Sequence, residues 1–120
     1  MTVSQQGVID WLGVEKETGD IVLTVVDQLD WSDEREHIRL LQEKLNTYLA
    51  CIESGEVFTR VKELGGEGRS GTPIKVAIVA RFDLTAQAQA FLRHATHIFA
   101  GVGVALSHRV QRDPEAGKPI

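Results

Sequence analysis

The chain has 120 residues, of which 42% are hydrophobic, and a formal net charge of −4 at pH 7. This length predicts one domain with a single core, and the composition excludes a disordered chain, a collagen-like repeat and a two-domain enzyme. Cys51 is the only cysteine in the sequence, which excludes a disulfide scaffold. We expect a cytoplasmic protein with no membrane-spanning segment and no signal peptide.

Two runs near the start of the sequence predict a β-hairpin. Residues 7–14 and residues 21–26 are rich in strand-forming side chains, and residues 17–20 between them are of the turn type. Two such runs joined by a short turn are typical of paired strands.

The spacing of the apolar side chains along the sequence changes around residue 30. Ser32 or Asp30 is expected to cap a helix that ends at Gly55. Cys51 flanks the apolar stripe of this helix, so we expect a packed thiol rather than a reactive one. The stripe repeats at steps of three and four, the spacing of one helical face, and contains Ile38, Leu41, Leu45, Tyr48, Leu49 and Ile52.

The second half predicts two strands, a helix and a last strand. Residues 56–62 and 74–82 alternate as strands do, and the glycine-rich segment 64–73 between them is expected to be a mobile loop. An apolar stripe from Leu84 to Val102 predicts a second helix, and residues 104–110 form the last predicted strand.

The expected order is therefore strand, strand, helix, strand, strand, helix, strand (ββαββαβ). The last six elements have the βαββαβ order of a ferredoxin-like unit, which places both helices on one face of the sheet. We expect an α+β two-layer sandwich, in which a five-stranded antiparallel or mixed sheet carries two helices on one face. Residues 1–112 form this domain, and residues 113–120, with two prolines, form a flexible C-terminal tail.

Part of the first half is similar to a known family. The residues that carry the similarity are Asp27-Gln-Leu-Asp-Trp31, His37, Leu41-Gln-Glu-Lys-Leu-Asn46, Tyr48-Leu49 and Ile52-Glu-Ser-Gly-Glu56. Through them the chain resembles a small bacterial family of uncharacterised proteins, known only as a domain of unknown function. The resemblance implies a compact α+β domain, and it implies no substrate, cofactor or catalytic residue.

One segment has the spacing of a nucleotide-binding motif. Residues 66–71 match GxGxxG, a pattern in which glycines let the backbone approach a pyrophosphate at the start of a helix. Here the motif is followed by Thr72, Pro73 and a predicted strand, so no helix terminus faces a phosphate. We interpret the segment as a hairpin loop and predict no cofactor.

Some acidic and histidine side chains have spacings that suggest metal ligands. Zinc needs three or four ligands, di-iron carboxylate sites need a four-helix bundle, and calcium loops have a different aspartate spacing. We therefore predict no metal site, with solvent-facing histidines on the second helix and two of the three aspartates acting as helix caps. The groups are His94 with His97, Glu34 with His37, and Asp27 with Asp30 and Asp33.

The charge distribution is the most informative feature of the sequence. Residues 1–56 carry 12 acidic and 4 basic side chains, whereas residues 57–112 carry 3 acidic and 8 basic ones. If the helices cover the sheet face that bears Ile74, the opposite face is basic and carries one aromatic side chain. The candidate binding residues on that face are Phe58, Arg60, Lys62, Lys75, Arg81 and Arg109.

Three functions remain open. The first is a non-enzymatic domain that acts through protein contact, with a second copy or another protein, because apolar surface is expected at Leu40, Tyr48 and Cys51 and on the sheet at Phe58 and Val79. The second is binding of an anion or a single-stranded nucleic acid on the basic face, which the negative net charge disfavours. An enzyme with an unrecognised pocket ranks last, and we predict no catalytic residue.

Overall fold

The computed structural model describes residues 11–66 and 71–111. Residues 7–10 of the first predicted strand, part of the glycine-rich loop and the predicted tail at 113–120 lie outside these ranges. The described residues form four strands and three helices in the order β1 (Trp11–Val14), β2 (Ile21–Asp27), α1 (Glu34–Glu53), α2 (Glu56–Glu63), β3 (Ile74–Ala80), α3 (Ala86–Ala100) and β4 (Val104–Val110).

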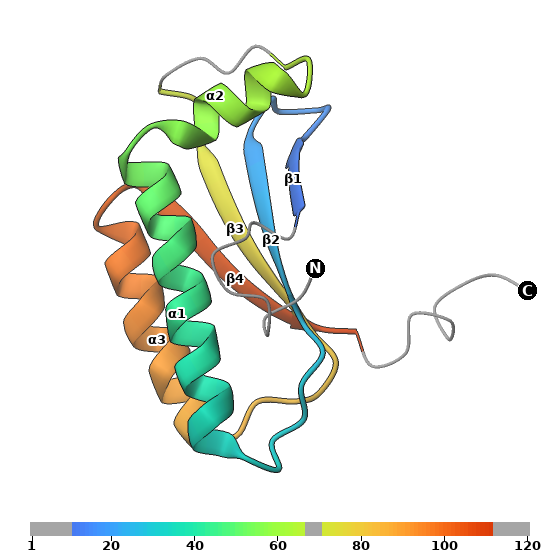
Figure 1. The fold of residues 1–120 in the computed structure, drawn as a ribbon, viewed down its shortest axis with the longest axis vertical. Helices are drawn as coiled ribbons and strands as arrows, with labels where there is room; N and C mark the ends of the chain where they lie inside the picture. The colour runs from blue at the N-terminus through green and yellow to red at the C-terminus, as the bar shows by residue number, and fades with distance from the viewer. Residues whose placement is uncertain (1–10, 67–70, 112–120) are drawn as a thin grey trace, which may run out of the picture.

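The strands form one mixed sheet and stand in it in sequence order, β1-β2-β3-β4. β1 is antiparallel to β2, whereas β2, β3 and β4 are parallel to one another. Connections between parallel strands are right-handed in nearly all proteins, so strands that are added in one direction place their connecting helices on the same face. α1 and α3 accordingly lie side by side over one face of the sheet, and α2 lies across its upper end (Figure 1).

The α+β class and the mixed sheet are confirmed, but the expected fifth strand is wrong because residues 56–63 form α2. Val57 and Val61, four residues apart, are both buried, and Glu56 pairs with Arg60 at the same spacing. Packing of this helix against α1 and β1 overrides the strand propensity of Val, Phe and Thr. The order of elements along the chain otherwise roughly matches the expected ββαββαβ, but the strands are not arranged as in a ferredoxin-like sheet, because every described strand lies beside its neighbour in sequence.

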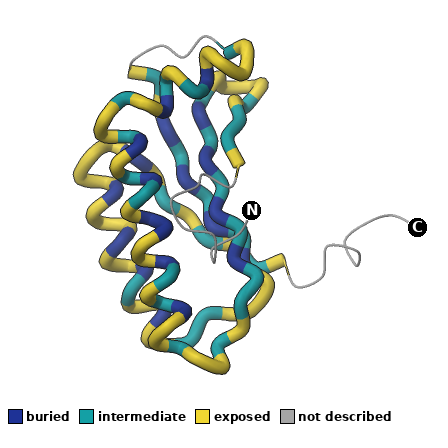
Figure 2. The backbone as a smooth tube through the Cα atoms, in the orientation of Figure 1, coloured by how far each residue is buried: buried dark blue, intermediate teal, exposed yellow. Residues whose placement is uncertain are grey.

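Alternating side chains of the sheet build the core. Every second residue of β2 and β3 is buried (Figure 2), so the face that bears Ile74, Val76 and Ile78 lies beneath the helices, as predicted. The hydroxyl of Tyr48 on α1 donates to the carbonyl oxygen of Thr24 at 2.6 Å and fixes the helix against β2. Cys51 is buried, as expected, and burial raises the pKa of its thiol.

Within the described part of the chain, no helix combines the length and the apolar character that crossing a membrane requires.

The junction between α1 and α2 depends on one glycine. Gly55 has a φ of 80°, and a Cβ built there would meet no atom within 4 Å, so backbone strain alone opposes a side chain. We expect Gly55→Ala to lower the free energy of unfolding by about 1 kcal/mol and Gly55→Asn by less, since Asn adopts this conformation more readily. Urea denaturation measures both losses, and equal losses would contradict this account of the junction.

Candidate functional site

A buried histidine–aspartate pair lies where β2 ends and α1 begins. Asp27 is the last residue of β2 and His37 lies near the start of α1, and they are only 2% and 3% exposed. Nε2 of His37 lies 2.8 Å and 2.7 Å from the two carboxylate oxygens of Asp27, and Nδ1 lies 2.8 Å from the carbonyl oxygen of Asp30. Trp31 stacks on the imidazole with ring centroids 3.6 Å apart. We call these four residues the β2–α1 cluster.

The turn between β2 and α1 holds the cluster through local hydrogen bonds. The Leu29 amide donates to the Asp27 carboxylate at 3.2 Å, and the amide and hydroxyl of Ser32 donate to Asp30 at 3.1 Å and 2.7 Å. The N-cap of α1 is Asp33, which accepts from the Glu36 amide at 3.2 Å. The prediction that Ser32 or Asp30 caps the helix was therefore wrong, because the Asp30 carboxylate accepts hydrogen bonds within the turn that precedes the helix.

The geometry makes Asp27 and His37 a neutral pair that shares one proton. Both ring nitrogens of His37 face oxygen acceptors, whereas a neutral imidazole carries a single N–H. A second proton therefore lies between Nε2 and the carboxylate, bound to one or the other. Burial raises the pKa of Asp27, and the hydrogen bond and charge of His37 oppose that rise. Burial tolerates a pair without net charge better than a single buried charge.

The pair is enclosed too tightly to meet a substrate. The side chains of His37 and Asp27 are 2% and 1% exposed, and general acid–base catalysis requires the group to reach the proton that it transfers. In this conformation the pair joins the end of β2 to the start of α1, and we assign it a structural role.

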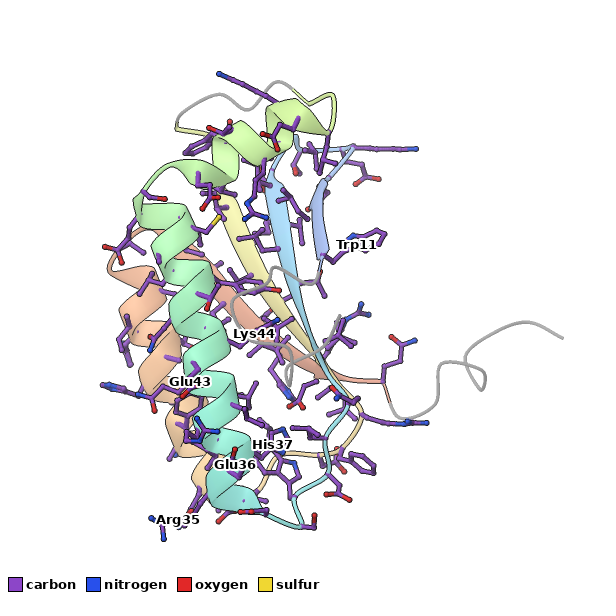
Figure 3. All side chains as sticks on the ribbon, viewed as in Figure 1. Trp11, Arg35, Glu36, His37, Glu43 and Lys44 are labelled. Atoms are coloured by element: carbon purple, nitrogen blue, oxygen red, sulfur yellow. The ribbon has the colours of Figure 1, made fainter. Side chains whose placement is uncertain are left out.

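Sequence reasoning missed that His37 and Lys44 are buried. Both lie on the side of α1 that faces the sheet, whereas Arg35 points away from it (Figure 3). The available signal was their spacing, because His37 precedes Leu41 by one helical turn and Lys44 follows it by nearly one. A polar residue within an apolar stripe of a helix indicates a buried polar contact.

The other residues whose spacing suggested metal ligands do not assemble into a site. His94 and His97 are both exposed on α3, as expected. No three His, Cys, Asp or Glu side chains of residues 11–66 and 71–111 gather closely enough to hold a metal ion.

Three of the predicted binding residues do not lie on the sheet. Phe58, Arg60 and Lys62 belong to α2, so placing them on a basic sheet face was wrong. Phe58 packs against the core, and Arg60 pairs with Glu56 at 3.2 Å. Their alternation along the sequence was mistaken for that of a strand.

Of the other three predicted binding residues, Lys75 and Arg109 project from the sheet face that the helices leave uncovered, and Arg81 directly follows β3. Lys75 lies 3.2 Å from a carboxylate oxygen of Asp20 and 3.2 Å from one of Glu15, and these bonds raise the pKa of Lys75. Arg81 and Arg109 are exposed at the carboxyl ends of β3 and β4. Neither forms an ion pair with another described residue, so these two guanidinium groups remain from the predicted basic face.

The pairing register of the strands identifies the other residues on the sheet face that the helices leave uncovered. Trp11 pairs with Thr24 and therefore projects on the same side, away from the helices (Figure 3), and it is 67% exposed. We call the following ten residues the uncovered face: Trp11, Val22, Thr24, Val26, Lys75, Ala77, Val79, Ala105, Ser107 and Arg109.

The buried pair predicts a large loss of stability when one partner is removed. We expect His37→Ala to lower the free energy of unfolding by about 3 kcal/mol, because the Asp27 carboxyl then stays buried without its partner. The matched control is Arg39→Ala, which removes exposed ion pairs with Glu36 and Glu43 on the same helix and should leave stability almost unchanged. Similar losses in the two variants, measured by chemical denaturation, would contradict the assignment.

The environment of His108 predicts how the free energy of unfolding depends on pH. It lies on the helix-facing side of β4, and burial lowers its pKa from the ordinary 6.5, while the charge of Asp27 opposes that shift. Between the two pKa values the unfolded chain binds a proton that the folded chain does not, so stability is lost as the pH falls below 6.5.

We therefore expect the unfolding temperature to fall between about pH 7.5 and about pH 5.5, and to fall less in His108→Asn. Thermal denaturation at several pH values measures both slopes. Parallel curves for the wild type and the variant would exclude His108 as the source.

Comparison with known proteins identifies a family for this chain but no activity. Neither the curated proteins nor the solved structures gave a match. The model of one family, described as a family of unknown function (DUF6572), matches residues 1–112. The matched segment includes the whole β2–α1 cluster and every described element, and the chain belongs to this family.

Proposed function

We propose that the protein acts through self-association, in which two copies pack their uncovered faces against each other. The observation that carries the proposal is a run of three parallel strands that the described helices cover on one side only. Parallel strands in proteins are almost always covered on both faces. A second copy supplies the missing layer without any other partner.

The side chains of the uncovered face suit close contact between sheets. Its centre consists of small or β-branched residues, with Thr24, Ala77 and Ser107 forming one row across the strands. Trp11 lies at the edge of that row, beside Thr24, with its indole largely in solvent. Exposed tryptophan at an interface typically supplies a large share of the binding energy.

The surface that the sequence suggested on α1 does not take part in this contact. Tyr48 and Cys51 are buried, and Leu40 and Phe58 pack against the core. Of the apolar residues expected to mediate contact, Val79 remains, on the uncovered face.

Charge favours one orientation of the two copies. Glu15 and Asp20 lie at the end of the face where β2 and β3 begin, and they outnumber Lys75 there. Arg81 and Arg109 lie at the opposite end. A two-fold axis in the plane of the interface and perpendicular to the strands places each arginine pair over the acidic end of the partner, whereas parallel strands would oppose like charges.

The size of the face indicates a weak dimer. Strands about 4.8 Å apart and about seven residues long span roughly 20 Å by 23 Å. This footprint of about 450 Å² is smaller than the roughly 800 Å² per partner of a standard stable interface. We therefore expect a weak dimer that dissociates on dilution.

Binding of an anion or a single-stranded nucleic acid has less support. Three of its six residues lie on α2, and Lys75 is engaged by two carboxylates. Arg81 and Arg109 alone provide fewer phosphate contacts than nucleic-acid binding normally uses.

Sedimentation velocity over a range of concentrations tests the dimer. We expect Trp11→Ala and Ala77→Arg each to weaken association by about tenfold or more, since one removes the anchor and the other places a charge in the centre. Leu64→Ser is the matched control, because Leu64 is 69% exposed on a different surface and should leave association unchanged. A wild-type protein that stays monomeric at about millimolar concentration would contradict the proposal.

Orientation is tested by exchanging charges. Arg81→Glu should weaken the dimer, and adding Glu15→Arg to the same chain should restore it, because this axis stacks β3 on β3 of the partner and brings Arg81 over Lys75, which Glu15 contacts. Failure of the second change to restore association would exclude this orientation.

A further inference from the structure

A groove of about 400 Å³ lies between α3 and β4, apart from the uncovered face. Gln89, Arg93 and His97 line it from α3 at successive intervals of four residues, and His108 lines it from β4. Leu84 and Leu92 add an apolar portion. This volume is within the range of small-molecule sites.

The polar lining of the groove carries the positive charge of Arg93. It contains Arg93, His97 and His108 and no aspartate or glutamate. Arg93 makes no ion pair with another residue of the described ranges, whereas Arg39 and Arg60 are neutralised by glutamates on their own helices. In a chain with a net charge of −4, an arginine left unpaired beside two histidines is available for an external anion.

We propose that this groove binds a small organic oxyanion, a carboxylate or a phosphate monoester, with its charged group on Arg93 and His97 and its apolar part on Leu84 and Leu92. The planar guanidinium can donate two parallel hydrogen bonds to such an oxyanion. The Gln89 amide, one helical turn before Arg93, supplies a further donor.

His108 completes the groove through its ring. Its Nε2 atom is buried and has no hydrogen-bond partner among residues 11–66 and 71–111, so the ligand contacts the face or edge of the imidazole rather than this nitrogen. The ring is nevertheless part of the wall, and its magnetic environment changes when the groove is occupied.

Proton NMR of the histidine side chains tests the site, with inorganic phosphate, acetate and hexanoate added at constant pH. The ring signals of His97 and His108 should shift together and reach saturation. His94 is the internal control, because it is exposed on the same helix but does not line the groove. Tighter binding of hexanoate than of acetate assigns a carboxylate with an apolar chain, and tighter binding of phosphate assigns a phosphate monoester.

Two variants distinguish a built site from general attraction of anions. Arg93→Gln should weaken binding by about tenfold or more, because a charge-assisted pair of hydrogen bonds is lost. Arg35→Gln removes an exposed arginine on α1 that does not line the groove, and should leave binding unchanged. Equal effects of the two variants, shifts that do not saturate, or an equal response of His94 would overturn the proposal.

Trp11→Ala should leave anion binding unchanged, because Trp11 lies on the uncovered face and not in the groove. Failure of the dimer and failure of the anion site are therefore separate outcomes.

Discussion

The handedness of the connections between parallel strands governs this structure. β2, β3 and β4 follow one another across the sheet in a single direction, so right-handed connections bring α1 and α3 to the same side. In doubly wound folds the strand order reverses, and helices then cover both faces. Without that reversal, the sheet has one densely packed face and one face whose centre consists of short side chains that the described helices leave uncovered. The core, the uncovered face and the groove beside β4 all follow from that arrangement.

Regular periodicity made most of the fold predictable. The alternation of Ile74, Val76 and Ile78 identified the buried face of β3, and the stripes on α1 and α3 identified both long helices. α2 was not predictable in the same way, because eight residues are too few to separate a helical period from a strand period. Gly55 was recognised as the end of one helix, but where the chain went next depended on the contacts of Val57 and Val61 with distant elements.

The site was less predictable because its contacts join different elements. Asp27 and His37 are ten residues apart, and only the return of α1 over β2 brings their side chains within 2.7 Å. Both belong to the residues on which the family resemblance rested, as does Trp31. The similarity in sequence was therefore recognised, whereas the contact between these side chains was not predicted. The prediction for the basic residues failed in the opposite way, because it joined residues that the structure separates. Their order along the chain suggested one surface, whereas the structure divides them between α2 and the sheet.

The two tryptophans are intrinsic fluorescence probes of two different parts of the molecule. Trp31 is stacked on an imidazole at one end of the sheet, whereas Trp11 is mostly in water at its edge. Their indoles therefore sample unlike surroundings, and removing either one by substitution isolates the emission of the other. A change confined to Trp11 would report on the uncovered face, and a change confined to Trp31 would report on the turn between β2 and α1.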